Sequence, residues 1–278
     1  MAFTIVGDAA IVSGDVANSR KAAVFTGGNT DDYYQIDALA AARTAANDAV
    51  GTITAWINTG DKTSTGTILG FGDKNVVEFI ELNVEAGKLA ARCTDGTVAQ
   101  FVSVTDNVVI QPHIWYHVAV VQRADGHGVY FFVNGVLVPS TNTTTTDVNE
   151  WFNNCDGIDS GRVGAANKAG DDSVTQEFVG GISDLKYYNT ALTDTQILAD
   201  YRGTHLSTGC IAWYDMADLK DQATGGGTYD MTAVSDVYLT PTYNEFISRV
   251  RKFGAVVADA AGFTENMGRM SVLFINAA

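Results

Sequence analysis

Apolar and β-branched runs alternate with turn residues along most of the chain, most densely near its middle. Tyr116–Gln122 and Val129–Val133 are two such runs joined by a Gly-containing loop, which predicts a β-hairpin. Asn134-Gly135 is the dipeptide most favoured in a tight turn, so Val136–Val138 is expected to begin a third strand. Both faces of the second run are apolar, which favours a hairpin covered on both sides, as in a sandwich of two sheets.

Similar runs continue on both sides of the hairpin at intervals of about 8–12 residues, which favours a sandwich over alternating strands and helices. Two short helices are expected, at Ala38–Asn47 and at Thr193–Tyr201, where Thr193 and Gln196 form a capping box. Pro139–Gly161 is mostly polar and predicts a long loop. The other expected strands are Phe3–Val6, Ala22–Phe25, Thr52–Ile57, Thr67–Phe71, Val76–Val84, Lys88–Cys93, Val98–Val104 and Ser271–Ile275.

Five parts of the chain resemble, in the same order, the motifs of the concanavalin A-like, laminin-G-like (LamG) jelly rolls. They are Val24–Tyr34, Thr52–Ile57, Ile68–Asp73, the central hairpin with Trp115–Val121 and Val133–Val138, and Gly181–Thr193. The resemblance covers about residues 20–205. It implies an all-β fold, an antiparallel jelly-roll β-sandwich. Relatives bind sugars, proteins or calcium, and some are glucanases, so the resemblance alone selects no single function.

The sandwich is expected at residues 1–207, and residues 208–278 are expected to form a small C-terminal α+β extension. Gly209–Met216 resembles the opening of the LamG family, so the extension is either a truncated second repeat or an arm that packs back on the sandwich. A helix from Thr242 to about Ala261 carries an apolar stripe and a basic cluster. It predicts a docking element, with a helix packed on its own sandwich as the alternative. The docking residues are Phe246, Arg249, Val250, Arg251, Phe253 and Val257.

The formal net charge of -15 makes nucleic acid and anionic membranes poor partners. No stretch reaches the roughly 18 apolar residues of a membrane span, so membrane insertion is not expected. The first residues lack the basic and apolar regions of a Sec signal peptide. Cys93, Cys155 and Cys210 are odd in number and far apart, which predicts buried thiols and neither a disulfide framework nor a zinc motif.

Carboxylates are the residues to examine for catalysis, because a retaining glucanase needs two of them close together over a cleft. Glu78, Glu81 and Glu85 come nearest to that arrangement. Glu78 and Glu81 are three residues apart in an expected strand, so they point to opposite faces and cannot share a cleft. We interpret these groups as solvated charges on a sheet, and we predict no catalytic residues and no enzyme activity.

The resemblance also implies a calcium site, since calcium-binding relatives use carbonyls of the opening loop and an Asp of the closing motif. Gly27, Asn29 and Asp32 match the loop, and Asp184 is the nearest carboxylate of the closing motif. The first Asp of that motif is Ser183 here, which departs from the family pattern. Turn residues that cap their own backbone are the alternative, and no other cofactor is expected.

A sugar-binding platform needs exposed aromatic rings flanked by amides and carboxylates. The long loop offers these groups in one run, and the opening loop offers a second choice. The first set is Trp151, Phe152, Asn153, Asn154 and Asp156, and the second is Tyr33 and Tyr34. The alternative is that Trp151 and Phe152 anchor the long loop on the sandwich, because a long polar loop needs an apolar tether.

Two functions follow from these observations. The first is a non-catalytic structural or adhesion protein on the surface of a larger particle, such as a capsid decoration, head-fibre or tail protein of a phage virion. It rests on the missing signal peptide, the C-terminal extension and the acidic surface. Its expected partners are other virion proteins and further copies in a homo-oligomer, at a virion surface or outside cells. The second is a soluble carbohydrate-binding module that recognises cell-surface glycans, with calcium dependence left open.

Overall fold

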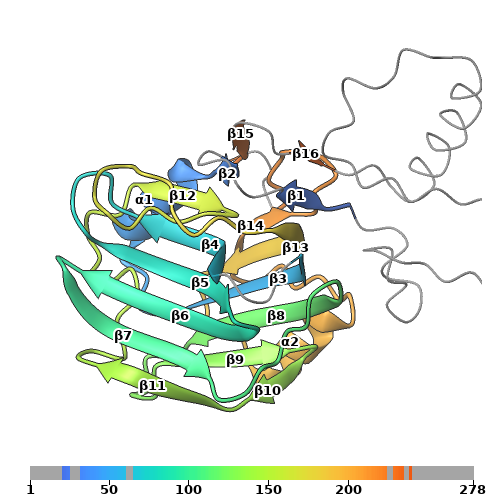
Figure 1. Ribbon diagram of the computed structural model, residues 1–278, viewed down its shortest axis with the longest axis horizontal. Helices are drawn as coiled ribbons and strands as arrows, with labels where there is room; N and C mark the ends of the chain where they lie inside the picture. Colours follow the sequence, from blue (N-terminus) through green and yellow to red (C-terminus); the bar gives the residue numbers. More distant parts are fainter. Residues whose placement is uncertain (1–20, 26–31, 61–64, 224–227, 235–237, 240–278) are drawn as a thin grey trace, which may run out of the picture. The chain divides into compact units, whose positions relative to one another are not determined.

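The structure is a computed structural model of the 278-residue chain, and it describes residues 21–25, 32–60, 65–223, 228–234 and 238–239 (Figure 1). The chain divides into two compact units, residues 1–240 and residues 241–278. The second unit lies outside the described residues, and so does the predicted docking helix with Phe246, Arg249, Val250, Arg251, Phe253 and Val257. The boundary predicted at residue 207 falls inside the first unit.

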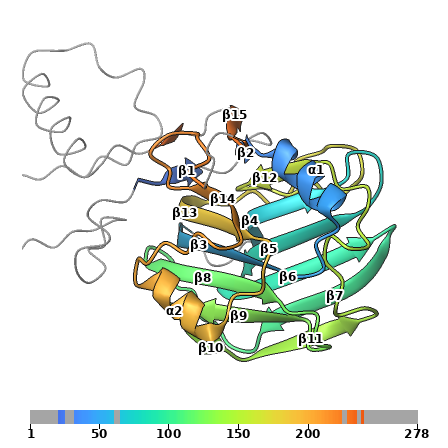
Figure 2. The ribbon, with the colours of Figure 1, turned by 180° about the vertical axis from the view of Figure 1, so that it is seen from behind.

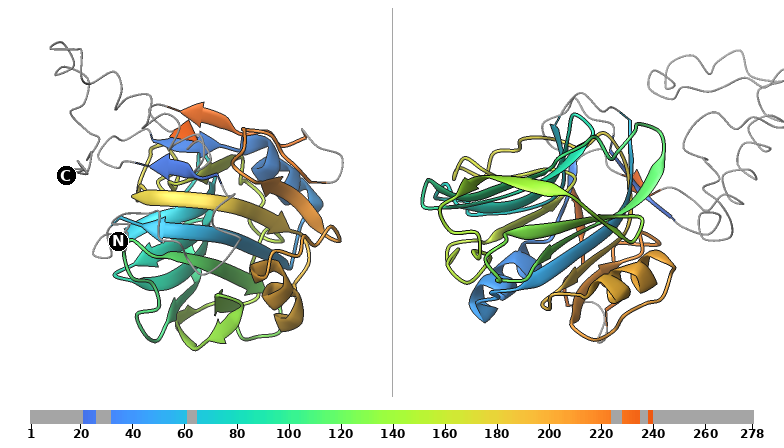
Figure 3. Two further views of the ribbon diagram at one scale, coloured as in Figure 1. Left: turned by 90° about the vertical axis from the view of Figure 1, so that its right-hand side faces the viewer. Right: turned by 90° about the horizontal axis from the view of Figure 1, so that it is seen from below.

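The described strands form two antiparallel sheets of eight strands each, which face each other as layers (Figure 3). The first sheet has the order β10 (Val136–Val138), β9 (Val129–Val133), β8 (Trp115–Gln122), β3 (Gly51–Thr59), β13 (Gly180–Tyr188), β1 (Ala23–Phe25) and β16 (Tyr238–Leu239), and β14 (Cys210–Tyr214) also pairs with β13. The second has the order β11 (Ser140–Thr145), β7 (Val98–Thr105), β6 (Lys88–Asp95), β5 (Phe79–Glu85), β4 (Thr65–Gly72), β12 (Ser160–Val163), β2 (Tyr33–Gln35) and β15 (Thr232–Val234). This architecture confirms the predicted all-β sandwich.

The main core lies between the two sheets, because alternate residues of each strand point inward. Phe131 of β9 belongs to this core, whereas its neighbour Phe132 belongs to a second apolar cluster on the outer face of the first sheet. The prediction that the central hairpin is covered on both faces is therefore confirmed. The helix α1 (Asp37–Ala46) matches the expected helix near residue 40 and contributes Leu39 and Ala40 to the main core.

The helix α2 (Asp194–Tyr201) covers the outer face of the first sheet over β8, β9 and β10 (Figure 2). Its predicted capping box is present, since the Thr193 hydroxyl accepts from the backbone N–H of Gln196 and the Gln196 side chain accepts from that of Thr193. Leu192 and Ile197 pack in the second cluster. Local sequence thus begins the helix, and burial of its apolar side holds it on the sheet.

The stretch 140–145 was predicted as part of a loop, and this prediction is wrong. These residues form β11, which pairs with β7 as the edge strand of the second sheet. The reason is the run of threonines, whose β-branched side chains favour extended backbone. Its side chains alternate between half-buried and exposed, as expected for an edge strand with one solvated face.

Three strands of the predicted C-terminal extension are part of the sandwich. In the first sheet β14 lies alongside β13 and β16 lies alongside β1, and in the second sheet β15 lies alongside β2. The Tyr214 hydroxyl donates to the Tyr229 carbonyl at 2.6 Å, which connects the two segments. β14 and β15 therefore pack back on the sandwich, which was one of the two alternatives for this extension. None of the helices in the described ranges is both long enough and apolar enough to cross a lipid bilayer.

Candidate functional site

The aromatic pair predicted for sugar binding lies in the main core. Trp151 is 1% exposed and Phe152 is fully buried. The Trp151 indole N–H donates to the Tyr187 hydroxyl at 3.3 Å, and the Phe152 ring meets the Phe71 ring edge-on at 5.1 Å between centroids. An exposed platform made of Trp151 and Phe152 is therefore wrong, and the alternative of an apolar tether for the loop is confirmed.

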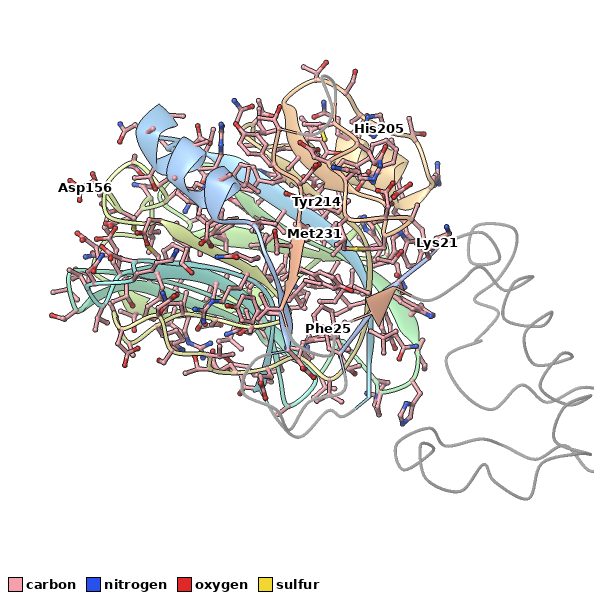
Figure 4. The ribbon with its side chains drawn as sticks, turned by 90° about the horizontal axis from the view of Figure 1, so that it is seen from above. Lys21, Phe25, Asp156, His205, Tyr214 and Met231 are labelled. Atoms are coloured by element: carbon pink, nitrogen blue, oxygen red, sulfur yellow. The ribbon has the colours of Figure 1, made fainter. Side chains whose placement is uncertain are left out.

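The polar neighbours of this pair do not form a platform either. The Asn153 side chain accepts from the Trp151 backbone N–H at 2.9 Å, so it caps the turn. The Asn154 amide donates to a Glu150 carboxylate oxygen at 3.5 Å. Asp156 is exposed and lies at the left-hand edge of the molecule in Figure 4, away from Phe25. Asn153, Asn154 and Asp156 lie in the turns of the loop. The two aromatic residues predicted to lie beside them, Trp151 and Phe152, are buried, so these residues do not form a sugar-binding platform.

The second predicted pair is also covered. Tyr34 is buried and its ring meets Phe25 edge-on at 5.8 Å. Tyr33 is half-buried, and the guanidinium of Arg162 lies 4.7 Å from the centre of its ring. One face of Tyr33 is therefore occupied by a cation, and Tyr34 is not exposed for contact with a sugar.

The predicted calcium residues are only partly within the described ranges, because Gly27 and Asn29 lie outside them. Asp32 is buried. One Asp184 oxygen contacts the Lys186 ammonium at 2.9 Å and the other accepts from the Trp213 indole N–H at 2.7 Å. In the described part of the chain, Asp32 and Asp184 do not belong to a group of acidic, His or Cys side chains close enough to share an ion. Calcium binding stays a prediction.

The carboxylates of β5 are not the solvated charges that were expected. Glu81 and Glu85 are four residues apart, so they share the outer face of the second sheet, a relation that the comparison of Glu78 with Glu81 overlooked. Arg92 of β6 contacts both carboxylates, and Lys168 lies 3.0 Å from Glu81. A cation thus contacts both acids, and although burial opposes this effect, the Arg92 guanidinium beside Glu85 lowers the pKa of that carboxyl.

Glu78 immediately precedes β5 and is buried on the inner side of the strand. Its carboxylate accepts from the Gly157 backbone N–H at 2.9 Å. Burial raises the pKa of Glu78 to about 7, and the backbone hydrogen bond only partly opposes this effect. Glu78 and Glu81 therefore lie on opposite sides of the sheet, as the three-residue spacing predicted.

An open hollow on the described surface lies where the turn between β8 and β9 meets the start of α2. It has a volume of about 480 Å³ and is lined by Arg123, Ala191, Leu192, Thr193, Asp194 and Thr195. Arg123 contacts Asp194 at 2.6 Å, which joins the turn to the helix. The hollow therefore has a cation, a carboxylate and hydroxyl groups along its wall.

A stack of flat groups stands beside this hollow. The rings of His127 and Tyr130 are nearly parallel with centroids 4.3 Å apart, and the Arg123 guanidinium lies 4.3 Å from the Tyr130 ring centre. The Tyr130 hydroxyl donates to Asp125 at 3.0 Å. His127 and Asp125 are exposed and Tyr130 is half-buried. We call Arg123, Asp125, His127, Tyr130 and Asp194 the turn site.

The turn that carries this site is held in place by its own hydrogen bonds. The Gln122 side chain accepts from the Ala124 N–H at 2.8 Å, and the Asn149 side chain accepts from the Gly126 N–H at 2.7 Å. Gly126 has a positive φ of 86°, which favours glycine over other residues. From the sequence, this loop is predicted only as a hairpin connection. Its signal was the presence of Arg, Asp and His beside a tyrosine in a short Gly-containing turn.

A match to the concanavalin A-like lectin/glucanases superfamily covers residues 27–198. The chain belongs to this superfamily. The membership confirms the resemblance drawn from the sequence motifs. No curated protein sequence matches the chain.

Solved structures of the same fold include a sialidase-associated CBM40 from Ruminococcus gnavus bound to alpha2,3 sialyllactose, with 17% identity and a TM-score of 0.52 over 64% of this chain and 97% of that one. A heptameric SAP-like pentraxin from Limulus polyphemus has 14% identity and a TM-score of 0.53, over 82% of this chain and 98% of that one. A leech intramolecular trans-sialidase has 16% identity and a TM-score of 0.52, over 72% of this chain and 30% of that one. At these identities the similarity establishes the fold alone.

Proposed function

We propose that this protein is a non-catalytic carbohydrate-binding domain and that it holds a sugar at the turn site. The observation that carries the proposal is the exposed His127 ring, which stacks on the half-buried Tyr130 ring beside an open hollow lined by Arg123 and Asp194. A sugar ring has an apolar face of C–H groups and a rim of hydroxyls. An aromatic surface next to a few convergent charged and hydroxyl groups complements both.

The chemistry of the site supports a sugar over an apolar ligand. The Arg123 guanidinium can donate hydrogen bonds, and the Asp125 and Asp194 carboxylates can accept them. A sugar hydroxyl therefore finds a partner whether it accepts or donates a hydrogen bond. The groups lie on a hairpin of the first sheet and on a capped helix, and this rigid support lowers the entropy lost on binding. The Ruminococcus gnavus CBM40, which has the same fold, is bound to a sialylated sugar, and this agrees with the proposed ligand class.

The proposal includes the absence of catalysis. The two carboxylates that share a face of β5 are engaged by Arg92, and a general acid of a glycosidase must instead be protonated when the substrate arrives. The predicted role on a virion surface and the predicted homo-oligomer rest on the sequence arguments above. Light scattering after size-exclusion chromatography tests the oligomer directly.

A glycan array, with and without a calcium chelator, tests the proposal. We expect binding to at least one glycan class, followed by measurement of the affinity by calorimetry. Replacing His127 with Ala removes the exposed ring, and the loss of one stacking contact corresponds to about a 3- to 10-fold weaker affinity. Replacing Arg123 with Met removes the cation and is expected to weaken binding further, because its charged hydrogen bonds are the stronger ones.

His205 supplies a matched control for His127. It is also an exposed histidine stacked on an aromatic ring, with its centroid 4.1 Å from that of Trp213, but it lies outside the turn site. The H205A variant should bind like the original protein. The absence of binding to any glycan in both conditions would remove the carbohydrate proposal. If H127A and H205A lost the same amount of glycan affinity, the turn site would not be the place where the sugar binds.

A further inference from the structure

We propose that Cys93, Glu150 and Cys155 form a binding site for a thiophilic divalent cation, with zinc as the expected ion. The two sulfur atoms lie 3.5 Å apart, and the Cys155 sulfur lies 3.7 Å from a Glu150 carboxylate oxygen. All three side chains are buried, and one ligand atom from each lies within 4.8 Å of the others. They form the one such group of His, Cys, Asp and Glu found in the described ranges.

The three residues come from two distant parts of the chain. Cys93 points inward from β6, and Glu150 and Cys155 lie in the loop that follows β11. The Gln122 side chain donates to the Glu150 carbonyl at 3.2 Å, and the Trp151 and Phe152 rings anchor the next two residues in the core. The loop is therefore held so that both of its ligand atoms face Cys93. Sequence spacing gives no sign of this, because 62 residues separate the two cysteines.

Two of the three distances between ligand atoms agree with tetrahedral coordination, and the third, between Cys93 and Glu150, is within 4.8 Å. At Zn–S bond lengths of about 2.3 Å, two sulfur ligands of one tetrahedral ion lie about 3.7 Å apart, and a carboxylate oxygen lies slightly nearer to each sulfur. The separations found here, 3.5 and 3.7 Å, lie within a few tenths of an ångström of those values. Three protein ligands leave one position of the ion for water or another small ligand.

The charges around the cluster also favour a cation. The charged groups that act on both cysteines include Glu78 and Glu150, and Asp95 acts on Cys93 as well. All of these groups are acids. Glu78 and Glu150 are buried and Asp95 is half-buried. Burying acidic groups together is costly unless they keep their protons or share a cation. A divalent ion bound by two thiolates and a carboxylate would release the protons of these three groups and neutralise much of the buried charge.

The donor set selects the kind of ion. Thiolates are soft ligands that favour zinc and copper(I), whereas calcium and magnesium require oxygen ligands. A disulfide between Cys93 and Cys155 is the competing outcome. It would account for the two sulfurs, but it would leave the Glu150 carboxylate buried against them without a counter-ion. The position of Glu150 therefore favours the cation.

Titration of the reduced, chelator-treated chain with Co²⁺ is the first test, because cobalt replaces zinc and its thiolate complexes absorb in the near ultraviolet. We expect one equivalent to produce this absorption and one equivalent of Zn²⁺ to abolish it. In C93S and C155S the thiolate absorption should fall by about half or vanish, and E150Q should weaken the affinity about 10-fold or more. Cys210 is buried but is not in the cluster, so C210S is the matched control and should titrate like the original chain.

If a cysteine variant does not fold, measurements on the original chain still test the proposal. Mass spectrometry under native conditions should show one Zn²⁺ per chain, and the chelator should lower its Tm. No thiolate absorption in the folded original chain overturns the proposal. A mass lower by two hydrogens in place of bound metal, after anaerobic reduction and purification, overturns it in favour of the disulfide. Equal absorption in C93S and C210S also overturns it.

Discussion

The outer faces of the two sheets both carry acids paired with bases, but only one of them is closed. On the first sheet α2 covers a network in which Asp200 contacts His117 at 3.1 Å and Lys186 at 2.8 Å, with all three side chains buried. On the second sheet, Arg92 and Lys168 join Glu81 and Glu85, and the two bases are about one-quarter exposed. The charges of the first network therefore interact through a lower effective dielectric constant than the charges of the second.

This difference determines what each network does. A fully buried ion pair contributes little net stability, but the loss of one partner leaves an uncompensated charge in the interior. The first network thus fixes the position of α2, whose first residue, Asp194, is part of the turn site. The second network stays in contact with water, which screens the loss of one charge. The comparison leads to three predictions, ordered from the largest effect to the smallest.

The largest effect is expected for Asp200→Ala. Removing this carboxylate takes the carboxylate partner from the buried His117 ring and leaves the buried Lys186 ammonium with Asp184 as its partner at 2.9 Å. Because this charge network is desolvated, the free energy of unfolding should fall by about 3–5 kcal/mol. Urea denaturation followed by tryptophan fluorescence measures it. The variant N189A, which changes a half-buried residue outside the network, is the control and should change stability by less than about 1 kcal/mol. If D200A lowered the free energy of unfolding as little as N189A does, the network under α2 would not be shielded from water as described.

An intermediate effect concerns pH and Glu78, a buried acid whose nearby charged groups include Asp95, Asp156 and Asp73. Its pKa is raised by burial to about 7, so the folded state holds this proton more tightly than the unfolded state does. The corresponding stability is fully present below the unfolded value near 4.5 and is lost as the pH rises through 7, by about 3 kcal/mol at most.

Denaturation between pH 4 and 8, with a chelator present, measures this contribution of Glu78. The difference in unfolding free energy between the original chain and Glu78→Gln should change steadily across that range, in the direction that makes E78Q relatively more stable at high pH. A difference that stays constant with pH would show that the Glu78 carboxyl keeps its ordinary pKa.

The smallest effect is expected for Arg92→Met on the open face. Glu81 keeps Lys168 as a partner at 3.0 Å, and Glu85 is only half-buried. The loss should therefore be about 1–2 kcal/mol, less than that of D200A. Urea denaturation at low and high salt measures it, and the difference should shrink at high salt because exposed charges are screened. If R92M lowered the free energy of unfolding as much as D200A does, the charges on both outer faces would be equally shielded from water.

The outcomes for particular residues show how far sequence reasoning reached. The Thr193–Gln196 capping box and the hairpin around Asn134-Gly135 were predicted correctly, because each depends on residues that are close in sequence. The sequence left two roles possible for Trp151 and Phe152, an exposed platform for a sugar or an apolar tether for the loop, and the structure shows the tether. The composition of a loop does not reveal whether its aromatic rings point to solvent or to the core.

The turn site and the cysteine cluster were not predicted from the sequence. Arg123 reaches Asp194 across 71 positions of the chain, and Cys93 meets Cys155 across 62. Glu81 and Glu85 were on the same strand and could have been paired from their spacing alone. The contact of Lys168 with Glu81 could not be predicted, because 87 positions of the chain separate the two residues.

The sequence by itself determined that this chain forms two layers of antiparallel strands, because strand periodicity and turn residues act over a few neighbouring positions. Only the tertiary structure decided which aromatic rings are buried, which charges are closed off by α2, and which distant side chains converge into the turn site and the cysteine cluster. Those outcomes depend on which segment covers which face. Periodicity specifies that a face must be covered, but not by what.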